Sequence, residues 1–450
     1  MSRVFLDYAA ITPIDQKVTK EMEKAQKFWA NPSSLHQEGE MAKKTLEEAR
    51  IKIARILHCK ANEIFFTSGG TESLNLAILG VIKSQSRTFG TGAVQSPTLA
   101  FQGSDIGFVL PHIITSTIEH PAVLEPIKSL IKGGGVEVSF VGPNEKGIIS
   151  PESIKKEIKE NTVLVVIQHA NNEIGTIQPI QKIAKIIKEC RRAPSVNTEG
   201  ALLQYPYFLV DACQSVLYEN VSLERLGADL LVLDGIKMYG PRGAGVLVVK
   251  HAVRIEPVIF GGGQEGGVRS GTENVPVAVG LAKALEIATE MKEKESARLI
   301  KLRDYAILKI LKEIPDSSLN GDLENRLPNN INICFAKSQS RTFGTGAVQS
   351  PTLASQNFGS QGSPLKTLAP KGDPLRNFDS EFLVIKLDTL GFAVSIASAC
   401  HTLSLENGSY VIESLGKSEC ASSSLRVTLG RDTKKSDLDK LVVALKKIIH

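Results

Sequence analysis

Short apolar runs alternate with stretches of helical spacing along the first half of the chain. The apolar runs have the length of buried strands and cover residues 63–67, 112–116, 136–141, 163–168, 207–210, 228–233 and 245–249. Apolar residues at helical spacing occupy much of the sequence between them, as at residues 15–29, 36–57, 73–82 and 179–190. Buried strands separated by helices predict a parallel sheet covered on both faces. We therefore expect an α/β fold whose large domain spans residues 14–262.

The glycine-rich stretch at residues 260–265 separates this region from a second one. Helical spacing continues to about Ile314, and an apolar stripe from Leu438 predicts a closing helix. Short strands are predicted between these helices, at residues 331–335, 394–401 and 425–430. We assign residues 263–450, together with residues 1–13, to a smaller α+β domain.

One polar segment occurs twice. The run Ser-Gln-Ser-Arg-Thr-Phe-Gly-Thr-Gly-Ala-Val-Gln-Ser-Pro-Thr-Leu-Ala begins at Ser84 and recurs from Ser338 to Ala354. It has neither helix nor strand periodicity, and its composition is typical of flexible loops. We interpret the two copies as surface insertions within residues 84–111 and 338–379. A partner-binding segment is the alternative.

Polar side chains collect where the predicted strands end. They are His120, Asn172, Asp211, Gln214 and Lys237. Ligands of parallel sheets bind at the carboxyl ends of the strands. This coincidence predicts a single site at that edge.

Lys237 lies between two apolar runs, just before the turn Gly240-Pro241-Arg242-Gly243. Poor solvation disfavours an ammonium ion, lowers its pKa and makes the free amine available as a Schiff-base nucleophile. A surface lysine in a loop is the alternative. Upstream, a predicted strand is followed by the pair Gly69-Gly70 and by a helix that starts near Thr71. This arrangement predicts an anion site at the helix N-terminus, and a capped helix without a ligand is the alternative.

A lysine, an anion site and a strand-end acid together suggest pyridoxal phosphate. Asp211 could keep the ring nitrogen protonated, and Asn172 or Gln214 could hydrogen-bond the phenolic oxygen. His120 could stack on the ring and shuttle protons, or be an ordinary polar residue. The sequence predicts no metal site.

Two residues near the C-terminus extend this picture. Arg426 stands among apolar residues, where a buried guanidinium needs an anion such as a substrate carboxylate or a structural salt-bridge partner. Cys400 follows a run of small residues, where a thiol can be exposed and mobile. We interpret Cys59, Cys190, Cys334 and Cys420 as inert core residues, and Cys213 as packing against Asp211.

Charge and composition exclude other functions. The net charge of +5 is small for 450 residues and gives no case for nucleic-acid or membrane binding. The apolar stretches are too short to span a bilayer, and the first residues lack the core of a signal peptide. Six scattered cysteines without a C-x-x-C pair argue against a zinc site or a disulfide framework and favour the cytoplasm.

Ten segments in order resemble the cysteine desulfurases, pyridoxal-phosphate enzymes of the class-V aminotransferase group with fold type I. They cover nearly the whole chain outside the insertions: LDYAAITP, NPSSLH, FTSGGTESLNLA, ITSTIEHPAV, HANNEIGTIQPI, VDACQS, KMYGPRGAG, GGGQEGGVRSGTENV, SIASACH and SSSLRVTLGR. The resemblance implies a mainly parallel seven-stranded sheet, a homodimer, L-cysteine as substrate and alanine as product. Sulfur would pass to an iron–sulfur scaffold or a tRNA-thiolation relay.

The resemblance also implies roles for individual residues. Lys237 would carry the cofactor as a Schiff base, with His120 stacked on the ring and Asp211 on the pyridinium nitrogen. Cys400 would take the sulfur as a persulfide. The remaining roles are binding roles: Asn172 and Gln214 for ring and substrate, Gly70, Thr71 and the partner protomer's Thr272 for phosphate, and Arg426 with Asn31 for the substrate carboxylate.

The chain departs from the family at Asp234-Gly235-Ile236-Lys237, where many relatives have Ser-x-His-Lys. An ionised aspartate would repel the phosphate, so we expect weaker cofactor binding or an Asp234 side chain that turns away. Ile396 stands among the small residues that precede Cys400, so we expect the mobility of this loop to differ from that in relatives. Two other functions stay open: a selenocysteine lyase or other class-V lyase or aminotransferase, and a degenerate, non-catalytic binding module.

Overall fold

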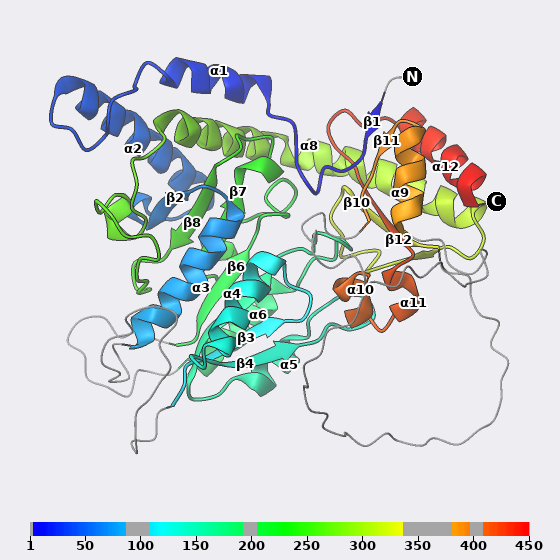
Figure 1. Cartoon of the computed structure of the whole chain (residues 1–450), viewed down its shortest axis with the longest axis horizontal. Coiled ribbons are helices and arrows are strands. Elements are labelled where there is room, and N and C mark those ends of the chain that lie inside the picture. The colour runs from blue at the N-terminus through cyan, green and yellow to red at the C-terminus, as the bar shows by residue number, and fades with distance from the viewer. Residues whose placement is uncertain (1–2, 87–108, 192–204, 336–379, 397–407, 450) are drawn as a thin grey trace, which may run out of the picture.

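Seven strands form the central sheet of the computed structural model, which describes residues 3–86, 109–191, 205–335, 380–396 and 408–449 (Figure 1). In spatial order they are β2 (Ile64–Thr67), β8 (Gly245–Val249), β7 (Leu230–Asp234), β6 (Tyr207–Asp211), β5 (Thr162–Gln168), β3 (His112–Ser116) and β4 (Glu137–Val141). β8 runs antiparallel to both its neighbours, and the other pairs are parallel. The predicted α/β fold with a mainly parallel seven-stranded sheet is confirmed.

Helices bury both faces of this sheet, as the continuous apolar runs predict. Successive residues of β5 point to opposite sides, so that Val165 and Ile167 join one core while Leu164 and Val166 join the other. One face is covered by α3 (Gly70–Ser86) and α4 (Pro121–Lys132). The other core includes residues of α1 (Gln16–Ala25), α2 (Gln37–Leu57), α5 (Pro151–Glu157), α6 (Ile180–Cys190) and α7 (Leu223–Leu226).

A smaller lobe contains two short sheets. In one, β10 (Asn330–Cys334) pairs antiparallel with β9 (Ser318–Leu319) and β12 (Ser424–Thr428); in the other, β1 (Val4–Phe5) runs parallel to β11 (Phe392–Ala393). Its helices are α9 (Ser380–Thr389), α10 (Tyr410–Ser414), α11 (Ser418–Ala421) and α12 (Lys435–Ile449). The first strand of the chain therefore pairs with one near its end.

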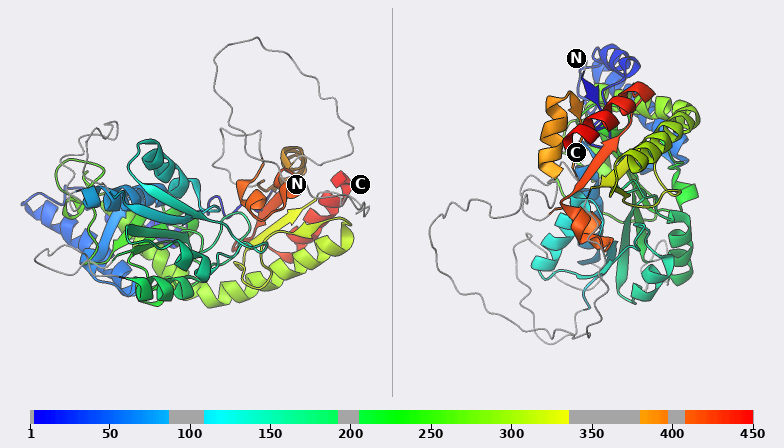
Figure 2. Two further views of the ribbon diagram at one scale, coloured as in Figure 1. Left: turned by 90° about the horizontal axis from the view of Figure 1, so that it is seen from below. Right: turned by 90° about the vertical axis from the view of Figure 1, so that its right-hand side faces the viewer.

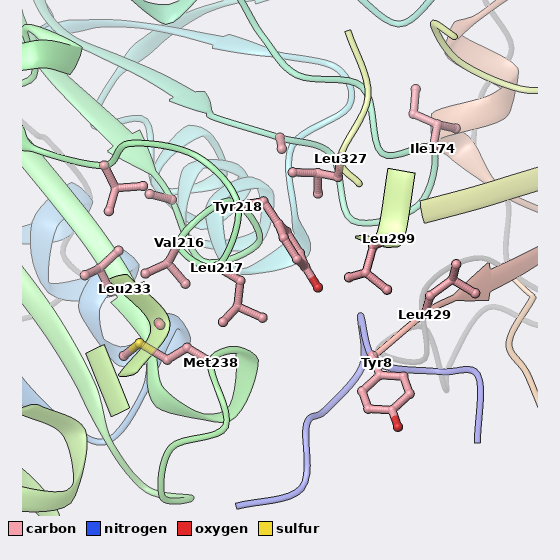
Figure 3. Close-up of a cluster of buried hydrophobic side chains, with 14 of the residues drawn as sticks. Tyr8, Ile174, Val216, Leu217, Tyr218, Leu233, Met238, Leu299, Leu327 and Leu429 are labelled. Carbon is pink, nitrogen blue, oxygen red and sulfur yellow. The ribbon is translucent and has the colours of Figure 1, made fainter. Parts of the chain in front are cut away.

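A single long helix links the two lobes. α8 (Val275–Glu313) packs against α1 and α2 at one end and against α12 at the other (Figure 2). Buried side chains also fill the junction: Tyr8, Leu299 and Leu429 belong to the same continuous core as Leu233 and Met238, with Leu217 and Tyr218 drawn between the two groups (Figure 3). The N-terminal segment is thus held where the lobes meet.

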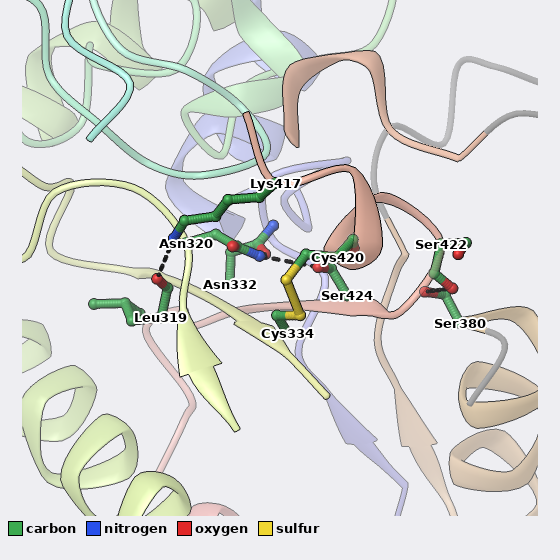
Figure 4. The surroundings of a disulfide bond; sticks show 9 residues. All are labelled: Leu319, Asn320, Asn332, Cys334, Ser380, Lys417, Cys420, Ser422 and Ser424. Carbon is green, nitrogen blue, oxygen red and sulfur yellow. Dashed lines mark hydrogen bonds between the residues drawn. A yellow bond between two sulfur atoms is a disulfide. The ribbon is translucent and has the colours of Figure 1, made fainter. Parts of the chain in front are cut away.

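Cys334 and Cys420 are buried in the core, as predicted, but the interpretation of them as inert thiols is wrong. The two residues form a disulfide that joins the end of β10 to α11 (Figure 4). Their Cα atoms are 5.3 Å apart, although 86 positions separate them in the sequence. Cys59, Cys190 and Cys213 are free thiols.

Most of both predicted insertions lies outside the described residues. The prediction that the first copy lacks helical structure is wrong at its start, because α3 continues through Ser86. Ser84 is buried there and donates to the carbonyl of Val81 (2.7 Å). Across the described ranges, every helix is too short or too polar to cross a membrane.

Candidate active site

The carboxyl ends of the central strands meet at one edge, with Gln168 of β5 in register with Asp211 of β6. Lys237 follows β7 in the single-turn helix η2 (Gly235–Lys237). Its amine donates to the carbonyl oxygens of Ala9 (2.8 Å) and Ala10 (2.7 Å). The Gln214 amide donates to the same Ala9 oxygen (3.0 Å). One backbone carbonyl of the N-terminal segment therefore brings Gln214 and Lys237 together, as the sequence predicts.

Asp211 is buried at the end of β6, and its Oδ1 accepts from the backbone N–H of Cys213 (3.0 Å). Burial raises the pKa of the Cys213 thiol well above its usual value, and the charges of Asp211 and Asp234 raise it further. The thiol is therefore protonated at neutral pH. This geometry agrees with the interpretation that Cys213 packs against the acid.

Asp234 does not turn away from the predicted anion site. Its Oδ2 accepts from the N–H of Gly70 (3.0 Å), the first residue of α3, and its Oδ1 accepts from the N–H of Ile236 (3.1 Å). A Cβ at Gly70 would lie 2.8 Å from the Cys213 sulfur and 3.1 Å from Asp234 Oδ2, so a side chain there would displace the sulfur. Thr71, the next residue, is exposed. Burial raises the pKa of the Asp234 carboxyl.

His120 is half-buried and caps the N-terminus of α4, because its Nδ1 accepts from the N–H of Ala122 (3.1 Å). In the neutral ring this bond assigns the proton to Nε2. Its neighbour Glu119 is fully buried, and its Oε2 accepts from the N–H of Gln168 (2.8 Å). Burial raises the pKa of Glu119 well above its usual value, and the charge of Asp211 raises it further. Sequence reasoning missed this acid, although it stands beside His120.

Arg426 is buried in β12, at the lobe junction. Its Nη1 donates to the carbonyl of Asn172 (3.1 Å) and its Nη2 to Oδ1 of Asp7 (2.9 Å), while its Nε lacks a partner among the described residues. Asp7 therefore forms a structural salt bridge with Arg426, which is the alternative to a substrate-binding role for this arginine. The sequence carries no signal that points to Asp7. The buried Glu173 interacts electrostatically with Arg426 and His120, and burial raises its pKa. The predicted residues Arg426 and Asn172 are therefore in contact.

Two predicted residues of the described chain, Asn31 and Thr272, are not joined to this cluster. Cys400 lies outside the described residues. Asn31 is exposed in the loop between α1 and α2, at the opposite end of the molecule from β12 (Figures 1 and 2). Thr272 lines a hollow of about 210 Å³ beside Ser68 and Arg269.

Comparison with known proteins assigns the family. The model of the class-V aminotransferases matches residues 4–94 and 110–360. The chain is 39% identical to cysteine desulfurase IscS of Dictyoglomus turgidum, with 99% of this chain and 94% of the relative aligned. It is 36% identical to IscS 1 of Archaeoglobus fulgidus, with 99% and 97% aligned.

Solved structures agree with this assignment. A NifS-like protein superposes with a TM-score of 0.76 at 29% identity, covering 99% of both chains. SspA in complex with cysteine superposes with a TM-score of 0.69 at 28% identity, covering 95% of this chain and 98% of the other.

The residues at the strand edge fit pyridoxal phosphate, on which class-V aminotransferases depend. The cofactor needs an amine, a carboxylate for its ring nitrogen and N–H donors for its phosphate. Lys237 would offer the amine and Asp211 the carboxylate, and the two lie close together, since both act electrostatically on Asp234 and Cys213. The N-terminus of α3 supplies donors, of which Asp234 already holds one. The chain belongs to the class-V aminotransferase family, among its pyridoxal-phosphate-dependent cysteine desulfurases.

Proposed function

We propose that this protein is a cysteine desulfurase, which removes the sulfur of L-cysteine, releases L-alanine and carries the sulfur as a persulfide on Cys400. The observation that carries the proposal is the placement of the Lys237 amine and the Gln214 amide on one carbonyl oxygen, close to Asp211. Full-length similarity to relatives named cysteine desulfurase supports the substrate.

Each residue of the cluster has a proposed role toward cofactor or substrate. Pyridoxal phosphate, when bound, supplies an electron sink for bond breaking at the substrate α-carbon. Lys237 holds the cofactor, and the Asp211 carboxylate keeps a proton on the ring nitrogen. The other contacts bind and orient: Gln214 and Asn172 for the ring and substrate, Gly70, Thr71 and the partner protomer's Thr272 for the phosphate, and Arg426 and Asn31 for the substrate carboxylate.

His120 is proposed to stack on the ring and to exchange protons through Nε2. The α4 cap occupies Nδ1, so Nε2 is the ring nitrogen left for this exchange. Capping and proton exchange are compatible, because the cap uses the lone pair of Nδ1 whereas the exchange uses Nε2.

We propose that the protein acts as a homodimer in the cytoplasm. Two large apolar side chains near Asn31, Trp29 and Leu35, are 80% and 94% exposed within one chain, which supports burial against a second copy. An iron–sulfur scaffold or a tRNA-thiolation relay is the proposed sulfur acceptor. Transfer of radiolabelled sulfur from the purified enzyme to each candidate tests this step.

Two substitutions test the assignment. Lys237→Ala should abolish the visible absorbance that the protein gains with pyridoxal phosphate, because the covalent link is lost. Cys400→Ser should keep this absorbance and stop sulfide release. Sulfide release at the parental rate by the Cys400 variant would refute the proposed sulfur carrier.

The same preparation separates the alternatives. Side-by-side assays with cysteine, selenocysteine and keto acids distinguish a desulfurase from a selenocysteine lyase or another class-V enzyme. A protein that stays colourless with added pyridoxal phosphate would instead be a degenerate binding module.

A further inference from the structure

Asp234 joins the end of β7 to the start of α3. It is the last residue of the strand and caps η2 through Oδ1, which accepts from Ile236. Its second oxygen, Oδ2, accepts from the first N–H of α3, a helix of 17 residues. The N-terminus of a helix carries a partial positive charge and unpaired N–H groups, which favour a bound anion. In this chain a carboxylate of the protein itself takes up that position.

Capping of η2 does not require a carboxylate. A serine can accept the same N–H with its single hydroxyl oxygen. The additional oxygen of Asp234 is the one that reaches Gly70, and it lies 3.1 Å from where a Cβ of that residue would stand. The acid therefore has a contact at α3 that its capping role does not explain.

We propose that Asp234 competes with the cofactor phosphate for the N-terminus of α3. Binding of the cofactor is therefore accompanied by uptake of one proton by Asp234. This inference rests on the proposed function, because it concerns the same pyridoxal-phosphate site. The proton comes from solvent and forms an O–H bond on the Asp234 carboxyl. The N–H of Gly70 then becomes available to a phosphate oxygen, and the new O–H can donate to the same phosphate.

The surroundings of Asp234 make this protonation accessible. Burial is the largest influence and raises the pKa of the carboxyl, and the charge of Asp211 on β6 raises it further. The N–H groups of Gly70 and Ile236 and the charge of Lys237 on η2 lower it. Cys213 is protonated and neutral, and β8 contributes Gly245 opposite Asp234. A phosphate at α3 adds negative charge and removes one stabilising N–H, and both changes favour the protonated acid.

The test compares pyridoxal phosphate with pyridoxal, which lacks the phosphate. Apoprotein of the parent, Asp234→Ser and Asp234→Asn is titrated with each by calorimetry, from about pH 6 to about pH 9. The pKa of Asp234 rises on phosphate binding, so affinity is highest at low pH. As pH increases, we expect the Kd of the parent for pyridoxal phosphate to rise by up to about tenfold per pH unit relative to the Kd of Asp234→Ser. Both proteins should bind pyridoxal within about twofold of each other, because the competition concerns the phosphate alone.

Proton uptake gives a second measurement that does not depend on catalysis. Titrations in buffers of different ionisation enthalpy should show about one more proton bound by the parent than by Asp234→Asn, which keeps the shape of the side chain without titrating. Equal Kd values for the parent and Asp234→Ser at every pH would overturn the inference and leave the proposed function standing. Equal weakening of pyridoxal and pyridoxal phosphate by the substitutions would also overturn it, since that pattern indicates a purely structural role. Failure of all three proteins to bind pyridoxal phosphate would overturn both proposals.

Discussion

Steric crowding at single residues determines how the site can be built. Gly70 has no Cβ, and the space where one would stand is bounded by the Cys213 sulfur and the Asp234 carboxylate. Its backbone is not in the left-handed region, so the requirement for glycine comes from contact and not from backbone strain. The missing Cβ leaves room for Asp234 to accept from the N–H of Gly70.

Gly70→Ala should therefore destabilise the fold. Overpacking a buried position costs about 1–3 kcal/mol of the free energy of unfolding. Removing the sulfur in Gly70→Ala/Cys213→Ala should restore part of that loss, which denaturant titration would detect. Gly142→Ala is the matched control, because a Cβ there meets nothing within 4 Å. Equal losses at Gly70 and Gly142 would contradict the crowding argument.

Glu119 should make stability depend on pH. Burial raises its pKa in the folded protein above the unfolded value, so its contribution is complete below the unfolded pKa and is lost as pH rises towards the folded one. The loss is at most about 1.4 kcal/mol per pH unit in that window. Glu119→Gln, which keeps a carbonyl oxygen for the N–H of Gln168, should lose less stability between about pH 5 and about pH 8. Parallel stability profiles of parent and variant would refute this.

Among the elements, apolar runs bounded by proline or glycine are the ones that the sequence predicts best. The strands at residues 112–116 and 245–249 have the predicted bounds, since Pro111 and Gly245 mark their starts. The pairing of β1 with β11 was not predictable, because two-residue strands carry no periodicity. The carbonyl of Ala9 has no side-chain signal, so its contact with Lys237 could come only from the fold.

The Cys334–Cys420 disulfide was missed for a related reason. Its two residues are far apart in sequence and lack a C-x-x-C spacing, and only the packing of α11 beside β10 brings them together. A crosslink that closes a long loop stabilises a fold mainly by restricting the unfolded chain.

Reduction of this disulfide should lower the free energy of unfolding by roughly 2–4 kcal/mol. Denaturant titrations with and without reductant would measure the change. Cys334→Ser/Cys420→Ser should lose its response to reductant, whereas Cys190→Ser, which removes a free thiol, should respond as the parent does. A parent protein that is insensitive to reductant would contradict a disulfide in the folded state.

At the scale of the whole molecule, Asn31 and Arg426 lie far apart within one chain, although both are proposed to bind the substrate carboxylate. Asn31 lies on the loop between α1 and α2, and Arg426 lies on β12 at the other end (Figure 1). In a two-fold dimer the same surface of each copy meets its counterpart, so that a loop of one chain can reach the site of the other. Asn31→Ala and Arg426→Ala should each lose activity alone, because each substitution would break both sites of the proposed homodimer.

Mixing these two variants during refolding should restore activity. Half of the dimers would then be heterodimers, each with one site in which both residues are intact, giving about a quarter of the parental sulfide release. Mixing Arg426→Ala with Lys237→Ala is the control: if both residues serve the site of their own chain, every site in that mixture lacks one of them. No recovery in the first mixture at a confirmed dimer mass would place Asn31 outside the partner's site, and recovery in the control would mean that Arg426 and Lys237 of one site come from different chains.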